Sequence, residues 1–168
     1  MQNDHHDAIA LFRRKFEAFR RLSTELGKEL AWEKMLEGYP ERQKKQMGAF
    51  INDSSSLAAG FSQAVPVFQK MGMSMEIVNI STARVDAVLE IQRKCPVLEL
   101  CKEYGLTKPC HVICEMDVEA TRRAFFPMRG DILCTQADGA SVCVFKYERD
   151  STGDDVSAGG NAANGANP

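Results

Sequence analysis

The six cysteines are the residues of this sequence whose type and spacing are best suited to chemistry. A thiolate is both a nucleophile and a metal ligand, and in a reducing compartment cysteines serve as buried thiols, ligands or reactive groups more often than as disulfides. Free cysteine is also among the most buried residue types, so packing in the core is the alternative for each of them. The six are Cys95, Cys101, Cys110, Cys114, Cys134 and Cys143.

Cys95 has the sequence environment of a reactive thiol. It ends a predicted strand and precedes Pro96, which is typical of the first position of a helix. Free N–H groups and the helix dipole would then favour the thiolate of Cys95. The sequence therefore predicts a nucleophile or ligand here, with an inert residue at the cap position as the alternative.

Cys110 and Cys114 lie four residues apart, so both thiols project from one face if this segment is helical. Such a pair can hold a metal with Glu115 or His111 beside it, but zinc motifs usually contain C-x-x-C pairs and this chain has none. Zinc stays an open cofactor hypothesis. Its candidate ligands are Cys95, Cys110, Cys114 and Cys143.

Charged residues that follow these cysteines are the candidates for proton transfer and substrate binding. Glu115 and Asp117 could transfer protons. Arg122 and Arg123 could bind a carboxylate, because a guanidinium offers a bidentate fork, although a solvated helix face is the commoner explanation. His111 is a further candidate for substrate binding or acid–base chemistry; beside apolar residues it could equally be a hydrogen-bonded core histidine.

The Asp138-Gly139 pair between two strand-like segments favours a two-residue type I′ turn. The register that follows predicts three facing pairs. Cys134 should face Cys143 in a closely spaced pair that could share a metal, form a reversible disulfide or pack. The other two pairs are Ile132 with Phe145 and Asp131 with Lys146.

The elements that must position these residues belong to an α+β fold. Apolar spacing predicts about three helical segments in residues 1–72, with a stop at Gly38-Tyr39-Pro40 and a kink or break at Pro66. Two hairpins, 73–93 and 129–149, should form a small antiparallel sheet, separated by short helices and covered by the N-terminal helices. We expect a single domain over residues 1–150, helical in 1–72 and mixed in 73–150. The Gly-, Ala- and Asn-rich residues 151–168 should form a disordered tail.

Composition narrows the function classes. Lys and Arg number 21 against 23 Asp and Glu, a net charge of −2, which makes a nucleic-acid-binding surface improbable. No apolar run is long enough to span a bilayer, and the start does not resemble a secretory signal, so we expect a cytoplasmic protein without a membrane partner. Phosphate-loop, dinucleotide, H-E-x-x-H and G-x-S-x-G motifs are absent. The remaining partners are a small molecule and a second copy bound through the N-terminal helices.

The stretch from Val85 to Tyr147 resembles the L-2-amino-thiazoline-4-carboxylate hydrolase-like family. The resemblance rests on Arg93-Lys-Cys95-Pro96, Cys101-Lys-Glu-Tyr-Gly105, Ile113-Cys-Glu-Met-Asp117 and Ala137-Asp-Gly-Ala-Ser-Val-Cys143-Val-Phe145. It implies hydrolytic opening of a cyclic amidine-thioether to carbamoyl-cysteine, with Cys95, Cys114 and Cys143 as the motif cysteines. A fainter similarity, to four-vinyl-reductase-type ligand-binding domains, implies helices on a small antiparallel sheet, a hydrophobic pocket and sometimes a cysteine-bound zinc.

Three hypotheses follow from these observations. The first is a hydrolase that acts on a small heterocyclic or carboxylate-bearing molecule at a site lined by Cys95, Cys114 and Cys143, with Glu115 or Asp117 as proton donor or acceptor. The second is a non-catalytic, sensor-type module that binds such a molecule, with or without zinc. The third is a structural protein that acts through its N-terminal helices.

Overall fold

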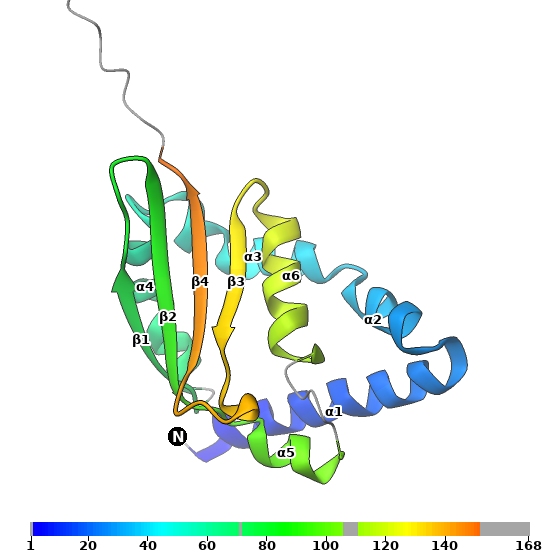
Figure 1. Cartoon of the computed structure of the whole chain (residues 1–168). Helices are drawn as coiled ribbons and strands as arrows, with labels where there is room; N and C mark the ends of the chain where they lie inside the picture. Colours follow the sequence, from blue (N-terminus) through cyan, green and yellow to red (C-terminus); the bar gives the residue numbers. More distant parts are fainter. Residues whose placement is uncertain (1, 71, 106–110, 152–168) are drawn as a thin grey trace, which may run out of the picture.

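The computed structural model describes residues 2–70, 72–105 and 111–151, and within these the fold is α+β (Figure 1). The helices are α1 (Gln2–Leu26), α2 (Lys28–Leu36), α3 (Tyr39–Asn52), α4 (Leu57–Lys70), α5 (Leu98–Glu103) and α6 (Cys114–Ala124). The strands are β1 (Ser74–Asn79), β2 (Val85–Lys94), β3 (Arg129–Cys134) and β4 (Cys143–Asp150). The predicted fold class is confirmed.

The N-terminal half contains one more helix than its apolar spacing predicted. Gly27 adopts a left-handed φ of 83°, which ends α1 and lets α2 start in a new direction. Gly38, at φ 68°, makes the next break where the sequence predicted a stop. Helix α4 continues through Pro66 to Lys70, so the break that we considered there does not occur.

The four strands form one antiparallel sheet in the order β1-β2-β4-β3. Both predicted hairpins are present and are joined by the pairing of β2 with β4. Helices α4 and α6 pack on the same face of the sheet, and α3 packs against both of them (Figure 1). The core lies between these helices and the sheet, closed by Phe12, Phe16 and Phe19 of α1.

Two contacts fix α4 on this face. The Asp86 carboxylate of β2 accepts hydrogen bonds from the backbone N–H of Leu57 at 3.1 and 3.0 Å, so a strand residue caps the start of α4. Gly60 lies so close to α3 that a Cβ atom there would come within 1.9 Å of the carbonyl oxygen of Phe50. The helix pair α3–α4 therefore packs with its backbones almost in contact.

The hairpin of β3 and β4 differs from the prediction at its turn. Ile132 faces Phe145 and Asp131 faces Lys146, as expected, but a bulge after Ile132 places Cys134 opposite Val144. The predicted pair of Cys134 and Cys143 is therefore wrong.

A 3-10 turn, η2 (Gln136–Asp138), replaces the two-residue turn at this hairpin. The Thr135 side chain caps it by accepting a hydrogen bond from the backbone N–H of Asp138, and Gly139 closes it at φ 93°. This capped turn adds residues to the loop and shifts the strand register.

Candidate functional site

A cavity of about 410 Å³, the main cavity, lies between helices α1, α3, α4 and α6 and the inner face of the sheet. Most of its wall is apolar, as in typical small-molecule sites, and a smaller set of polar side chains converges on it. The polar and thiol-bearing residues are Lys15, Tyr39, Gln43, Gln46, Glu90, Gln92, Cys95, Cys114, Asp117 and Thr121.

Of the three cysteines of the predicted site, two line the main cavity and the third, Cys143, is not part of its lining. Cys95, just after β2, and Cys114, the first residue of α6, both line the main cavity. Cys143 is 1% exposed and lies beside Cys95, to which its thiol is hydrogen-bonded. That bond and burial raise the pKa of Cys143, so its thiol stays protonated at neutral pH.

The position of Cys95 relative to the following helix differs from the expectation. Helix α5 begins at Leu98, so Pro96 is not its first residue, and the helix is only six residues long. The backbone N–H of Cys95 instead donates to the side-chain carbonyl of Gln136 at 3.1 Å. The N–H of Gln136 in turn donates to the Cys143 sulfur at 3.3 Å, so η2 holds both cysteines in place.

Asp117 is at the centre of a hydrogen-bonded cluster on one side of the main cavity. Its carboxylate accepts from the hydroxyl of Tyr39 at 2.7 Å and from the amide of Gln43 at 2.8 Å. Lys15 donates to the same Tyr39 oxygen at 2.8 Å, and Gln43 also reaches the Thr121 hydroxyl at 3.2 Å. Burial raises the pKa of Asp117, an effect that the Tyr39 hydrogen bond and the Lys15 charge oppose.

Glu90 is a second carboxylate of the main cavity and is 6% exposed. It lies on the inner face of β2, opposite Phe145 of β4, and its side chain accepts a hydrogen bond from Gln92 at 2.7 Å. Burial raises the pKa of Glu90 to about 7, with a smaller contribution from the negative charge of Asp117. A carboxyl with this pKa can both take up and release a proton at neutral pH.

Lys15 is the cationic side chain among the residues that line the main cavity. Burial lowers its pKa, and Asp117 opposes this shift. The cavity therefore presents an ammonium group and two carboxyl groups to a ligand.

Comparison of the sequence with known protein families gives one match. Residues 6–147 match the family model of L-2-amino-thiazoline-4-carboxylic acid hydrolase. The chain belongs to this family. No curated protein and no solved structure gave a significant match.

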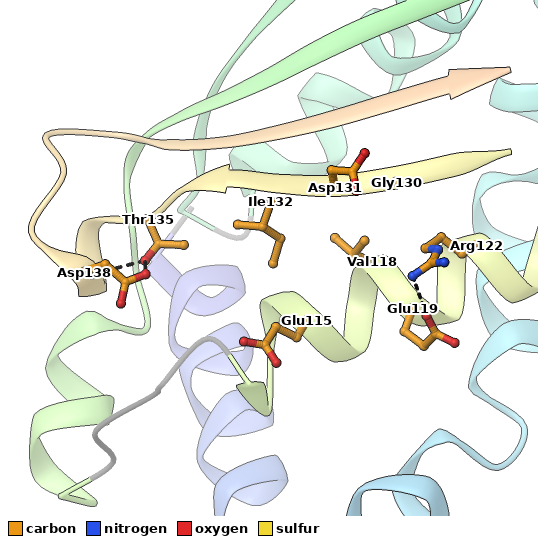
Figure 2. Close-up of a pocket in the computed structure, with 9 residues that line it drawn as sticks. All are labelled: Glu115, Val118, Glu119, Arg122, Gly130, Asp131, Ile132, Thr135 and Asp138. Atoms are coloured by element: carbon orange, nitrogen blue, oxygen red, sulfur yellow. Dashed lines mark hydrogen bonds and ion pairs between the residues drawn. The ribbon is translucent and has the colours of Figure 1, made fainter.

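Relative to the main cavity, the other predicted site residues of this family member lie on the far side of α6. Glu115 and Arg122 border a shallower groove between α6 and β3 (Figure 2). Arg122 pairs there with Glu119 at 3.2 Å, while Arg123 pairs with Glu119 at 2.8 Å and with Glu33 at 3.0 Å. The structure does not place Glu115, Arg122 or Arg123 in the lining of the main cavity.

His111 lies outside both hollows. Its ring stacks on Trp32 with centroids 5.5 Å apart, and its Nδ1 is 2.6 Å from the Glu115 carboxylate. Through these contacts His111 connects the start of α6 with helix α2, so its role here is to position these helices.

Within residues 2–70, 72–105 and 111–151, no three His, Cys, Asp or Glu side chains gather closely enough to hold a metal ion. Cys110, one of the candidate zinc ligands, lies outside these ranges, as does the predicted disordered tail apart from Ser151. No helix among the described residues is long and apolar enough to cross a membrane.

Sequence reasoning missed seven of the polar residues that line the main cavity, among them Lys15, Tyr39 and Glu90. Lys15 precedes Phe16 within an apolar stripe, and Glu90 shares the inner side of β2 with Val88, which is fully buried. A charged residue in phase with the buried Phe12 and Phe19 was the available signal for Lys15, whereas Glu90 lies on the more polar side of β2 and carried no such signal. Tyr39 follows Gly38 at a predicted helix break and carried no such signal.

Proposed function

We propose that the main cavity is a hydrolytic active site for a cyclic amidine that carries a carboxylate, the class of substrate in the family's name. The observation that carries the proposal is that two carboxyl groups with raised pKa values, the buried Glu90 and the half-buried Asp117, lie in one cavity with Lys15 and two thiols. Pairs of titratable groups with perturbed pKa values in a cavity are typical of sites for proton transfer.

In this proposal the polar cluster binds the two charged ends of the substrate. The Lys15 ammonium pairs with the substrate carboxylate, and the Tyr39 hydroxyl helps to fix the ammonium position. The Asp117 carboxylate accepts a hydrogen bond from the exocyclic amino group of the amidine. These contacts orient the ring, so that its amidine carbon faces a water molecule rather than the apolar wall.

Glu90 then acts as the general base. It removes a proton from water while the water oxygen bonds to the amidine carbon, and the carbon–sulfur bond of the ring breaks. Protonated Glu90 gives this proton to the leaving sulfur, which becomes a thiol. The second water proton ends on the ring nitrogen, so one water converts the cyclic amidine into a carbamoyl group and a free thiol.

Cys95 offers a covalent route that the same experiments can separate from direct attack by water. Its sulfur would add to the amidine carbon and displace the ring sulfur, and water would then hydrolyse the sulfur-linked intermediate. Cys95→Ser should abolish turnover on the covalent route. On the Glu90 route it should lower kcat by no more than about tenfold, since the serine still lines the cavity.

Glu90→Gln is the decisive variant, with Glu76→Gln as its control. Glu76 lies on the neighbouring strand β1 but is exposed and paired with Arg93. With 2-amino-thiazoline-4-carboxylate as substrate and carbamoyl-cysteine measured by mass spectrometry, Glu90→Gln should lower kcat at least about 100-fold. Glu76→Gln should retain wild-type kcat. Equal kcat values in the two variants would contradict the assignment of Glu90.

The second candidate is a non-catalytic module that binds the same class of molecule, which the largely apolar wall of the main cavity favours. Stabilisation of the wild-type protein by the ring compound, without any product, would support this function over hydrolysis. Zinc binding and a homodimer remain predictions that metal analysis and light scattering of the purified protein would test.

A further inference from the structure

The main cavity has two chemically different regions. The hydrogen-bonded cluster around Asp117 forms the polar region, between α1, α3 and α6. The apolar region lies along α4 and the start of α1, where it is lined by Leu11, Phe61, Val67, Phe68 and Met73. A ligand that fills both regions must itself have a charged end and an apolar end.

The size of the main cavity points the same way. A five-membered ring with one amino group and one carboxylate engages the polar residues and is small beside a space of about 410 Å³. Sites of roughly 300–1,000 Å³ hold ligands of drug size. The space left beyond the ring would be bordered by the aromatic and aliphatic side chains of α4.

Exposure of apolar side chains at the edge of the cavity is the third observation. Leu11 is 45% exposed and Val67 is 51% exposed, and both line the main cavity. Phe61, deeper in the same wall, is 5% exposed and stacks on Tyr147 with centroids 4.9 Å apart. The apolar surface is thus continuous from the buried wall to the solvent-exposed edge.

We propose that the natural substrate is a larger relative of the ring compound, with an aryl or alkyl substituent that lies against α4 and α1. The assignment of the charged end rests on the proposed function of the main cavity. The substituent contacts Phe61, Phe68 and Met73 and extends toward Leu11 and Val67. Its contribution is burial of apolar surface, so it acts mainly on affinity and not on the bonds that form and break.

A homologous series of ligands tests this inference. The probes are 2-amino-thiazoline-4-carboxylates titrated by calorimetry. They carry hydrogen, methyl, propyl, pentyl or phenyl on the ring carbon between the sulfur and the carbon that bears the carboxylate. Each added methylene should lower Kd by about fourfold until the apolar region is filled. The heat-capacity change on binding should become more negative along the series. Affinity that stays constant or falls with substituent size would overturn the inference.

Val67→Asp locates the substituent, with Leu30→Asp as the matched control. Val67 is exposed at the cavity edge, whereas Leu30 is 63% exposed on α2 and lies away from the cavity lining. Val67→Asp should remove most of the gain given by pentyl over hydrogen, so that the ratio of the two Kd values falls toward one. Leu30→Asp should keep the full gain. Equal losses in both variants would overturn the assignment of this region.

Turnover measured on the same series separates the two proposals. Hydrolysis of the unsubstituted ring with no gain from substituents would leave the proposed function standing and refute the inference about the substrate. Tighter binding along the series without hydrolysis of any member would refute the proposed function and support the ligand class. Glu90→Gln should keep the affinity gain along the series, because Glu90 acts on water and not on the substituent.

Discussion

The two sides of helix α6 carry similar residues in opposite environments. On one side, Cys114, Asp117 and Thr121 line the main cavity. On the other, Glu115, Glu119 and Arg122 border the shallow groove next to β3 (Figure 2). A helix turns by about 100° per residue, so neighbours in the sequence such as Cys114 and Glu115 point to different places.

The difference between the two sides is solvation. Asp117 is half-buried in the main cavity, where burial raises its pKa and its hydrogen-bond partners come from α3. Glu119 lies in the open groove and is paired with the guanidinium groups of Arg122 and Arg123. Such exposed ion pairs add little to stability, whereas a desolvated carboxylate is costly to the fold and useful to chemistry. Burial, more than residue type, therefore separates candidate catalytic groups from surface charges in this protein.

The largest expected effect is the pH-dependent loss in the free energy of unfolding that comes from burial of the Glu90 carboxyl group. Folding raises the pKa of Glu90 from 4.5 to about 7, so the stability associated with its neutral form is fully present below pH 4.5 and is lost as the pH rises through 7. Between pH 5 and pH 8 this loss should be about 2–3 kcal/mol in the free energy of unfolding.

Urea unfolding at the two pH values would measure this loss. Glu90→Gln should lack it and should be more stable than wild type at pH 8, while Glu76→Gln should follow the wild-type pH dependence. A wild-type protein and a Glu90→Gln variant with parallel pH profiles would show that Glu90 is not desolvated.

The next largest effect compares carboxylates on the two sides of α6. Asp117→Asn removes the negative charge that is proposed to bind the amidine and should lower kcat/KM about 100-fold, or about 2.7 kcal/mol. Glu119→Gln makes an equivalent change in the groove and should leave kcat/KM within about twofold. Steady-state kinetics on 2-amino-thiazoline-4-carboxylate decide between them. A greater loss of kcat/KM in Glu119→Gln than in Asp117→Asn would indicate that the active site is the groove and not the main cavity.

A smaller effect, on KM, compares the two cationic side chains that could bind the substrate carboxylate, Lys15 and Arg122. Lys15→Met should raise KM about tenfold for the carboxylate-bearing ring and leave KM unchanged for 2-amino-thiazoline, which lacks the carboxylate. Arg122→Met is the control on the other side of α6 and should change neither value. If Arg122→Met raised KM for the carboxylate alone, the sequence-based assignment of substrate binding to Arg122 would be right and that of Lys15 wrong.

The smallest effect concerns the surface ion pairs. Arg123→Met removes the contacts with Glu33 of α2 and with Glu119 of α6. Because these side chains are exposed, Tm should fall by no more than about 3 °C and kcat should not change. Differential scanning calorimetry at low and high salt would check this, and a large fall in kcat would indicate that the two sides of α6 are coupled.

Much of the fold could be predicted from the sequence because its patterns are local. The alternation of β2 and the helical spacing of α1 identified the elements, and the pairs Ile132–Phe145 and Asp131–Lys146 were predicted correctly. The turn was wrong because Asp138-Gly139 was treated as a complete two-residue turn. Thr135 caps a longer turn, and turn propensities do not predict whether its capping hydrogen bond will be favoured over a type I′ turn.

The candidate site was only partly predictable for a different reason. Cys95, Cys114 and Asp117 were identified by type and lie in the main cavity, but Glu115, Arg122 and Arg123 were also identified by type and lie on the other side of the helix. Glu90 was missed because it lies on the more polar side of β2. Strands usually bury their more apolar side, and here the side that includes Glu90 and Gln92 faces the helices.

The close packing of Gly60 against Phe50 has a consequence for how a ligand reaches the main cavity. Two helices whose backbones touch cannot slide or separate at that point without losing the contact, so α3 and α4 should move as one rigid unit. Access to the main cavity then depends on the side chains at its exposed edge, which include Leu11 and Val67. Replacing Gly60 with alanine would place a Cβ atom against the carbonyl oxygen of Phe50, so it should force α3 and α4 apart and weaken the fold.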